Sequence, residues 1–158
     1  MSTREKLTHS FEITRMLVHN FANGLSTEES LAAPLFKANS FNWVTGHMLV
    51  SRDLVLDLLG RPKVLSSAEE ALYETGSELV SAETALSLER LLAAFDTSQA
   101  EISQGLQNTS DNELAAVYDI ERKQTVLERI EGLHWHETYH LGQLEILRQV
   151  SAERESFP

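Results

Sequence analysis

Cysteine is absent from this sequence of 158 residues. Its absence excludes disulfide scaffolds, cysteine-ligated zinc, iron–sulfur clusters and cysteine nucleophiles. Basic residues are few, because 13 Lys and Arg stand against 24 Asp and Glu and give a net charge of −11. Acidic surfaces repel phosphate groups, and we therefore expect neither nucleic acid nor an anionic membrane as a partner.

Long apolar runs are also missing. No window approaches the roughly 20 apolar residues of a transmembrane helix, and the polar start over residues 1–6 leads into no signal-peptide run. We therefore expect a cytoplasmic protein. Proline occurs only at positions 34, 62 and 158, so residues 63–157 contain no proline that would break a helix.

Helical periodicity dominates what is present. Apolar residues recur at helical spacing over 3–23, 40–60, 81–108 and 121–150. Gly24 and Gly60 are typical of helix ends, and residues 81–84 are expected to open the third segment. Period-2 alternation is missing, which argues against strands. We expect an all-α four-helix bundle that forms a single domain over residues 1–158.

The connections between these segments have room for short extra helices. Residues 26–33 are typical of a cap and a short helical turn, and 67–79 of a short helix interrupted near Gly76. Ser110 and Glu113 match a capping box. Residues 114–120 fit either a short helix or an irregular connection.

Two of the six histidines share one helix face. His136 and His140 are four residues apart, so both can chelate one metal ion. The string that they bound, HETYH, is also the zincin protease motif H-E-x-x-H, in which the glutamate acts as general base. Its context argues against a protease, because Gly142 comes one position early for the metzincin form and Ile146 occupies the place of its third histidine.

A third ligand is therefore expected upstream. His47 lies on an apolar stripe with Trp43, Val44, Leu54 and Leu58, so it is expected to point into the core. Three buried histidines are costly unless something satisfies them. A shared metal would do so, and hydrogen bonds to backbone or carboxylates are the alternative. His9, His19 and His134 are not expected to be ligands.

Two motifs resemble those of the DinB-like superfamily. Residues 42–48 (NWVTGHM), followed by SRD at 51–53, look like its first motif. Residues 136–144 (HETYHLGQL) look like its second, H-E-x-x-H-x-G-Q, which Gly142 and Gln143 separate from zincins. The two motifs bracket most of the chain, and its length and helical layout also agree.

This resemblance implies a four-helix bundle with up-down-down-up topology and a divalent metal, usually nickel or zinc, at one end. It implies that His47, His136 and His140 hold the metal and that water occupies the remaining positions. Characterised members are S-transferases and isomerases that use bacillithiol, mycothiol or glutathione, and many members are homodimers.

Residues around the expected ligands have several possible roles. Glu137 either serves as a catalytic base, orients a ligand or is structural. Arg52 either binds a carboxylate of a thiol cosubstrate or forms a surface ion pair with a nearby aspartate. Close approach of another element would explain glycine at 46 and 142. Gln143 could donate to a group behind a ligand or pack at a helix contact. Trp43 and Trp135 either wall the metal pocket or simply pack in the core.

Three functions follow from these residues. The first is a metal-dependent thiol S-transferase that acts on a small electrophile; the thiol must be a cosubstrate because the chain has no cysteine. The second is a hydrolase in which hydroxide on the metal attacks an ester or amide. The third is a non-enzymatic metal-binding or stress-response bundle. In that third case the metal should contribute strongly to stability. From the apolar stripes, which bury enough surface without a metal, we expect most of the stability to survive chelation.

Overall fold

The computed structural model describes residues 2–34 and 38–153. Within them the chain forms four long helices, α1 (Thr3–Ala22), α3 (Phe41–Leu58), α5 (Leu88–Asn108) and α7 (Val126–Glu153). The connections hold three short helices, α2 (Thr27–Ser30), α4 (Ser67–Tyr73) and α6 (Asp111–Leu114), and a small hairpin of β1 (Val117–Asp119) and β2 (Gln124–Thr125). The all-α class expected from the sequence is confirmed.

Serine side chains start most of these helices. Ser2, Ser26, Ser66 and Ser110 each accept a hydrogen bond from the backbone of a glutamate three residues on, whose carboxylate accepts from the backbone of the serine. This capping box satisfies two donors that a helix start leaves open. The box expected at Ser110 is therefore confirmed.

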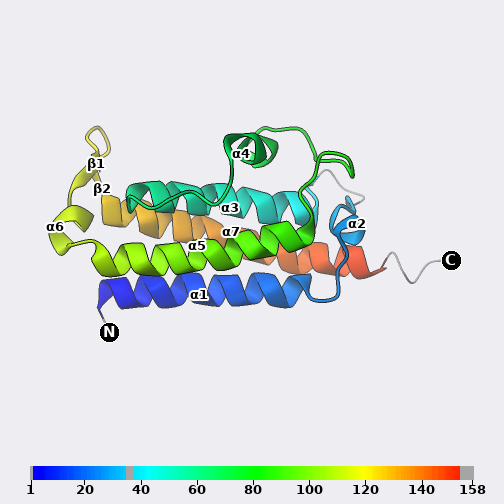
Figure 1. Cartoon of the computed structure of the whole chain (residues 1–158), viewed down its shortest axis with the longest axis horizontal. Helices are drawn as coiled ribbons and strands as arrows, with labels where there is room; N and C mark the ends of the chain where they lie inside the picture. Colours follow the sequence, from blue (N-terminus) through cyan, green and yellow to red (C-terminus); the bar gives the residue numbers. More distant parts are fainter. Residues whose placement is uncertain (1, 35–37, 154–158) are drawn as a thin grey trace.

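The four long helices lie side by side with nearly parallel axes (Figure 1). Helices α1 and α7 run in one direction, and α3 and α5 run in the other. Both α1 and α3 pack against α5 and α7, while α4 packs on α3. The hairpin lies at the start of α7, away from α2 (Figure 1).

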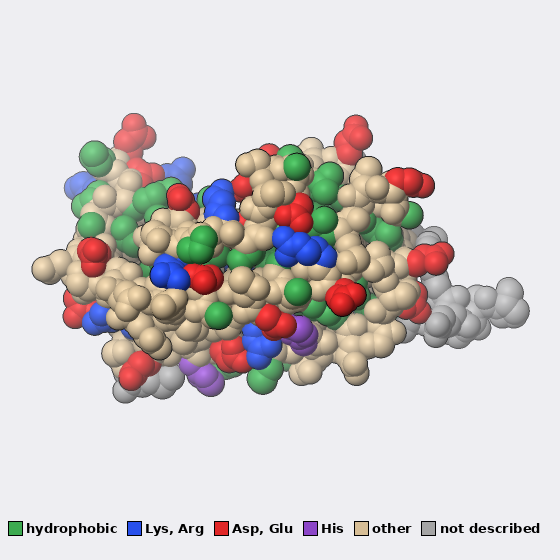
Figure 2. All heavy atoms as spheres, in the orientation of Figure 1, with side chains coloured by type: hydrophobic (Ala, Val, Ile, Leu, Met, Phe, Trp, Pro, Cys, Tyr) green, Lys and Arg blue, Asp and Glu red, His purple; other side chains and the backbone are tan. Residues whose placement is uncertain are grey.

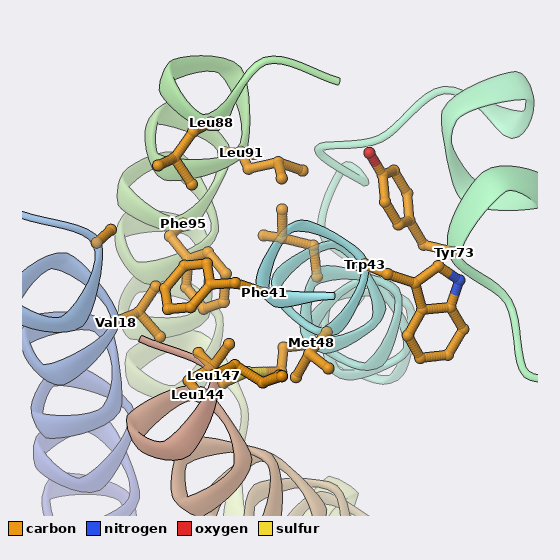
Figure 3. Packing of buried hydrophobic residues seen from close by; sticks show 14 of the residues in the cluster. Val18, Phe41, Trp43, Met48, Tyr73, Leu88, Leu91, Phe95, Leu144 and Leu147 are labelled. Carbon is orange, nitrogen blue, oxygen red and sulfur yellow. The ribbon is translucent and has the colours of Figure 1, made fainter. Parts of the chain in front are cut away.

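Two apolar clusters fill the bundle, and a polar layer separates them along the helices. The first contains buried side chains from all four long helices, many of which Figure 3 shows: Val18, Phe41, Met48, Leu88, Leu91, Phe95, Leu144 and Leu147. The second contains Leu7, Phe11, Val55, Leu56, Ile102, Leu106, Ile130 and Leu133. Between them lie four buried polar side chains, one from each long helix, which we call the polar layer: Thr14, Arg52, Ser98 and Glu137.

The third long helix begins later than the sequence predicts. Residues 81–84 do not open it; they form a separate turn in which the backbone N–H of Ala85 donates to the carbonyl of Ser81. The next backbone donors are taken by distant side chains, since Leu86 N–H donates to Tyr73 Oη and Leu88 N–H to Thr27 Oγ1. The helix therefore starts only at Leu88, where Ser87 caps it.

The expectation that the chain has no strands is wrong at residues 117–125, and so is the helix expected from residue 121. The strands pair antiparallel, with Val117 opposite Thr125 and Asp119 opposite Gln124. Each is too short to show an alternating pattern, and Lys123 adopts a left-handed conformation (φ 53°) between them. Thr125 and Glu128 then exchange the hydrogen bonds of a further capping box, which delays α7 to Val126.

Charged side chains are dispersed over the surface. Figure 2 shows acidic side chains scattered across the face viewed in Figure 1, with lysine and arginine among them. None of the helices in the described residues is long and apolar enough to span a membrane.

Candidate metal centre

Helices α3 and α7 bring three histidines together. His47 and His140 expose only 7% and 8% of their surfaces, and His136 is partly buried. Their ligand nitrogens all lie within 4.8 Å of one another, and Nε2 of His136 lies 3.0 Å from Nε2 of His140. Two nitrogens that bind one tetrahedral zinc ion at about 2.0–2.1 Å lie about 3.3–3.4 Å apart, so this pair would have to separate by only a few tenths of an ångström to bind one ion.

Hydrogen bonds fix the outer nitrogen of each imidazole. Nδ1 of His47 donates to the carbonyl oxygen of Tyr73 (2.8 Å), and Nδ1 of His140 donates to Oε1 of Gln143 (2.7 Å). Ser51 Oγ lies 3.4 Å from the carbonyl of His47 and 3.2 Å from Nδ1 of His136, and the tautomer of His136 sets which of the two accepts from the hydroxyl. A neutral imidazole carries one N–H, so Nε2 of His47 and Nε2 of His140 are each left with a lone pair, and Nε2 of His136 has one in the tautomer that donates from Nδ1 to Ser51.

The ligand nitrogens of the three histidines face one volume. Partners on the outer nitrogens are the usual way in which proteins orient metal-binding histidines, and with each imidazole protonated at Nδ1 three lone pairs would surround a cation there. The donor set therefore fits a divalent metal. The alternative of hydrogen bonds alone is satisfied in the other tautomer of His136, in which Ser51 donates to Nδ1 and Nε2 donates to Nε2 of His140.

The same site favours neutral imidazoles. Burial, followed by weaker contributions from His136 and His47, lowers the pKa of His140 to about 4 even though its bond to Gln143 acts in the opposite direction. Burial also lowers the pKa of His136; the neighbouring His47 and Arg129 add to the effect, and Glu137 acts in the opposite direction. Both rings are therefore deprotonated near pH 7, as metal ligands must be.

A close contact between α3 and α4 positions His47. A Cβ at residue 46 would overlap the ring of Tyr73, so only glycine lets α4 approach and bring the Tyr73 carbonyl to the imidazole. Tyr73 is anchored by its hydroxyl, which donates to Asn42 Oδ1 (3.0 Å). The close approach expected at Gly46 is confirmed. The same expectation is wrong for Gly142, which is exposed and whose Cβ would meet open space.

The two tryptophans lie differently about the cluster. Trp43 is buried, stacks on the imidazole of His47 with ring centroids 4.9 Å apart and donates from Nε1 to Ser77 Oγ. Trp135 is 69% exposed and stacks on Tyr139. Trp43 therefore covers one ligand from behind, whereas Trp135 is not a core residue.

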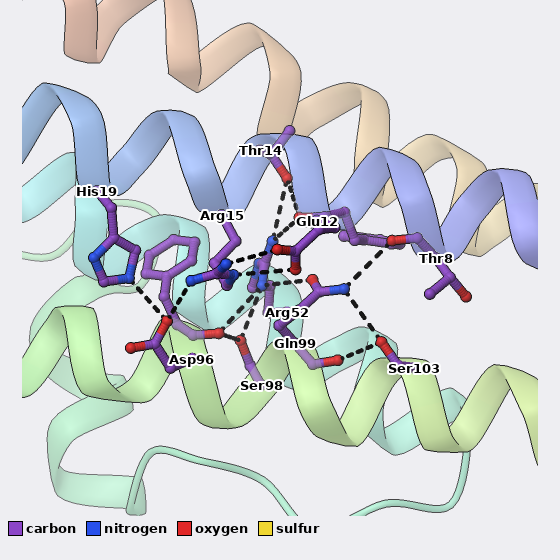
Figure 4. A network of polar contacts seen from close by, with 12 residues as sticks. Thr8, Glu12, Thr14, Arg15, His19, Arg52, Asp96, Ser98, Gln99 and Ser103 are labelled. Atoms are coloured by element: carbon purple, nitrogen blue, oxygen red, sulfur yellow. Dashed lines mark hydrogen bonds and ion pairs between the residues drawn. The ribbon is translucent and has the colours of Figure 1, made fainter.

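Arg52 and Glu137 pair with each other in the polar layer. Their side chains are 0% and 1% exposed, and Nη2 and Nε of Arg52 donate to the two carboxylate oxygens at 2.7 and 2.9 Å. Arg52 also donates to the carbonyl of Phe11 and to Ser98, while Thr14 donates to Glu137. Figure 4 shows Arg52 between Thr14 and Ser98. A surface ion pair with an aspartate, one of the two roles expected for Arg52, is therefore wrong.

The remaining histidines stay outside the cluster. His19 lies on α1 and pairs with Asp96 across to α5 (Figure 4). His134 packs edge-on against Phe11, and its buried Nε2 has no partner among the described residues. His9 is exposed. None of the three was expected to be a ligand.

Two clefts adjoin the cluster. One, of about 400 Å³, is lined by His47 and His136 together with Ser51, Leu54, Glu74, Arg129 and Trp135, among others. Leu54 was expected in the core, but it is partly exposed here. The other, of about 520 Å³, is lined mostly by apolar residues and by Gln143, the partner of His140: Ala38, Asn39, Val44, Leu79, Ile146 and Leu147.

Sequence reasoning missed the groups behind the ligands. The Tyr73 carbonyl is a backbone atom 26 residues from His47, so no side-chain pattern indicates it. Ser51 could have been found from the sequence, because it follows His47 by one helical turn and so lies on the same face of the helix. Arg129 could have been found in the same way, because it precedes His136 by two turns on one helix.

Comparisons with known proteins agree with this arrangement. The sequence model of the DinB superfamily matches residues 10–144, which include both motifs and all three histidines. A solved structure of a conserved protein from Enterococcus faecalis superposes with a TM-score of 0.77. The two sequences are 17% identical, and the match covers 96% of this chain and 98% of that one, so this likeness shows the fold alone. No functionally curated protein matches the chain.

Proposed function

The chain belongs to the DinB superfamily, and we propose that it is a metal-dependent thiol S-transferase that acts on a small electrophile. One observation carries the metal part of this proposal: the ligand nitrogens of three histidines lie within 4.8 Å of one another while every Nδ1 has a protein partner. Nickel and zinc both suit such a set of imidazoles. Three protein ligands also leave a coordination position open, as catalytic sites require.

The proposal of a transferase rests on the need for a thiol that does not come from the chain itself. A divalent ion bound there would supply Lewis acidity, which lowers the pKa of a coordinating thiol toward neutral pH. The described residues and the rest of the sequence offer no cysteine, so the thiol is a cosubstrate. Its sulfur forms a bond to an electrophilic carbon of the second substrate, the leaving group departs with the bonding pair, and the thiol proton passes to solvent.

The chain's own residues hold and shield these reactants. Tyr73, Ser51 and Gln143 fix the imidazoles, and Trp43 excludes water from behind His47. The two clefts adjoin the cluster through different residues, the smaller through His47 and His136 and the larger through Gln143. Two clefts favour a reaction of two substrates over hydrolysis, in which water needs no cleft of its own.

Metal content provides the first test. Tag-free wild type, His47→Ala and His9→Ala are incubated with zinc or nickel, desalted and analysed by mass spectrometry. We expect one equivalent of metal in wild type and in His9→Ala, whose residue is exposed and outside the cluster, and little in His47→Ala. Wild type without metal would refute the site.

Turnover provides the second test. Metal-loaded protein is mixed with 1-chloro-2,4-dinitrobenzene and a thiol, and release of chloride is followed against protein-free mixtures. We expect turnover that needs both metal and thiol. Ester hydrolysis without thiol would favour the hydrolase, and metal binding without turnover of either substrate would favour a non-enzymatic metal-binding bundle.

A further inference from the structure

Arg129 lies in the cleft of about 400 Å³ that His47 and His136 also line. It is on α7, seven residues before His136, which places the two Cα atoms about 10 Å apart along the helix axis. Its side chain is only partly buried, and its guanidinium lies over the ring of Tyr118 at 6.0 Å. The aromatic ring positions the group without neutralising its charge.

The charge of Arg129 has no carboxylate partner within residues 2–34 and 38–153. The other arginines of that part differ: Arg148 donates to a backbone carbonyl, and six form ion pairs, namely Arg4, Arg15, Arg52, Arg61, Arg90 and Arg122. In a chain with a net charge of −11, carboxylates are plentiful. An arginine left unpaired beside the histidine cluster therefore suggests an anion that arrives with a ligand.

The surroundings favour a carboxylate over a phosphate. Glu74 lines the same cleft and is exposed, and Glu128 and Glu131 flank Arg129 on α7. Glu128 is engaged at the start of the helix, where its carboxylate accepts from Thr125. These negative charges repel a phosphate dianion more strongly than a monoanion. A guanidinium also matches the two oxygens of a carboxylate in planar, bidentate geometry.

We infer that this cleft binds a carboxylate-bearing thiol, with the carboxylate against Arg129 and the sulfur at the histidine cluster. The inference rests on the proposed function and gives its cosubstrate a chemical class. It also replaces Arg52 as the anchor of the cosubstrate carboxylate, since the guanidinium of Arg52 is already occupied inside the bundle.

The test uses matched pairs of thiols. Binding of 3-mercaptopropionate and 3-mercapto-1-propanol, and of 6-mercaptohexanoate and 6-mercapto-1-hexanol, is measured by calorimetry on zinc-loaded protein at one fixed pH. The readout is the ratio of the two affinities within each pair. Three proteins are compared: wild type, Arg129→Gln and Arg122→Gln, whose residue is exposed on the hairpin.

We expect wild type and Arg122→Gln to prefer the acid of at least one pair by about tenfold, and Arg129→Gln to lose that preference while it still binds the alcohol. The two pairs have carbon chains of different length, because the spacing of about 10 Å between the Cα atoms of Arg129 and His136 does not fix the distance between sulfur and carboxylate in the bound thiol. An equal preference in wild type and Arg129→Gln, at unchanged zinc content, would overturn this inference alone. Absence of zinc, or of any thiol binding by zinc-loaded protein, would overturn the proposed function and this inference with it.

Discussion

Replacing Arg52 by methionine would leave the carboxylate of Glu137 buried without its cation. The two side chains are 0% and 1% exposed and share two hydrogen bonds of 2.7 and 2.9 Å. Removing one partner of such a pair costs about 3–5 kcal/mol, since a charge stays buried and uncompensated. A domain of this kind has only about 5–15 kcal/mol in total, so the variant loses a large part of its stability.

The assay is urea unfolding at pH 7, followed by circular dichroism. With an m value of about 2 kcal/mol/M, a loss of about 4 kcal/mol lowers the unfolding midpoint by about 2 M. Arg61→Met serves as the control, because Arg61 and Glu101 form a partly exposed pair. Removing that pair should cost at most about 1 kcal/mol.

A double variant separates the energy of the pair from its role. In Arg52→Met/Glu137→Leu no charge stays buried, so most of the stability should return. The polar layer then no longer opposes a shift of one helix along another, and such a shift moves His136, the neighbour of Glu137, relative to His47. We therefore expect weaker zinc binding despite recovered stability. A cost below about 1 kcal/mol for Arg52→Met, or a double variant less stable than the single one, would refute this reasoning.

Three further predictions follow from the centre and its supports. Gly46→Ala should destabilise the fold by about 1–3 kcal/mol and weaken zinc binding, because its Cβ overlaps the Tyr73 ring; Gly132→Ala, where a Cβ meets open space, is the control in the same melts and titrations. Zinc affinity should stay nearly constant from pH 8 to about 6.5 and be lost as the pH approaches 4, because burial lowers the pKa of His140 to about 4 and that of His136 in the same direction. The metal-free fold should also lose stability between pH 6.5 and 4, because the histidines of the unfolded chain bind protons at a higher pH than those of the folded chain. An affinity and a stability that do not change from pH 8 to 4 would contradict both predictions. Chelation should leave most of the unfolding free energy in place, because two apolar clusters fill the bundle; a chelator that unfolds the chain at 25 °C would show otherwise.

The sequence predicts those parts of the site that depend on one helix. His136 and His140 share a face because of their spacing alone, and the apolar stripe on α3 turns His47 inward. The pairing of Arg52 with Glu137 could not be predicted, because the two residues are 85 positions apart and meet only when four helices have packed.

The same reason accounts for errors in the connections. The start of α5 depends on Tyr73 and Thr27, which take backbone donors that a continuous helix would need. The hairpin consists of two strands of three and two residues, whose pairing carries no hydrophobic signal. The local sequence pattern therefore predicts helices whose own residues specify them. It fails where a residue distant in the sequence determines the start of a helix or the pairing of a strand.

The separation of the ligands along the chain has a consequence for biosynthesis. His47 on α3 emerges from the ribosome well before His136 and His140, which lie on α7. A nascent chain that ends before α7 holds only one of the three imidazoles of the cluster and lacks the chelating pair of His136 and His140. The proposed metal centre can therefore assemble only after α7 has been synthesised and has packed against α3.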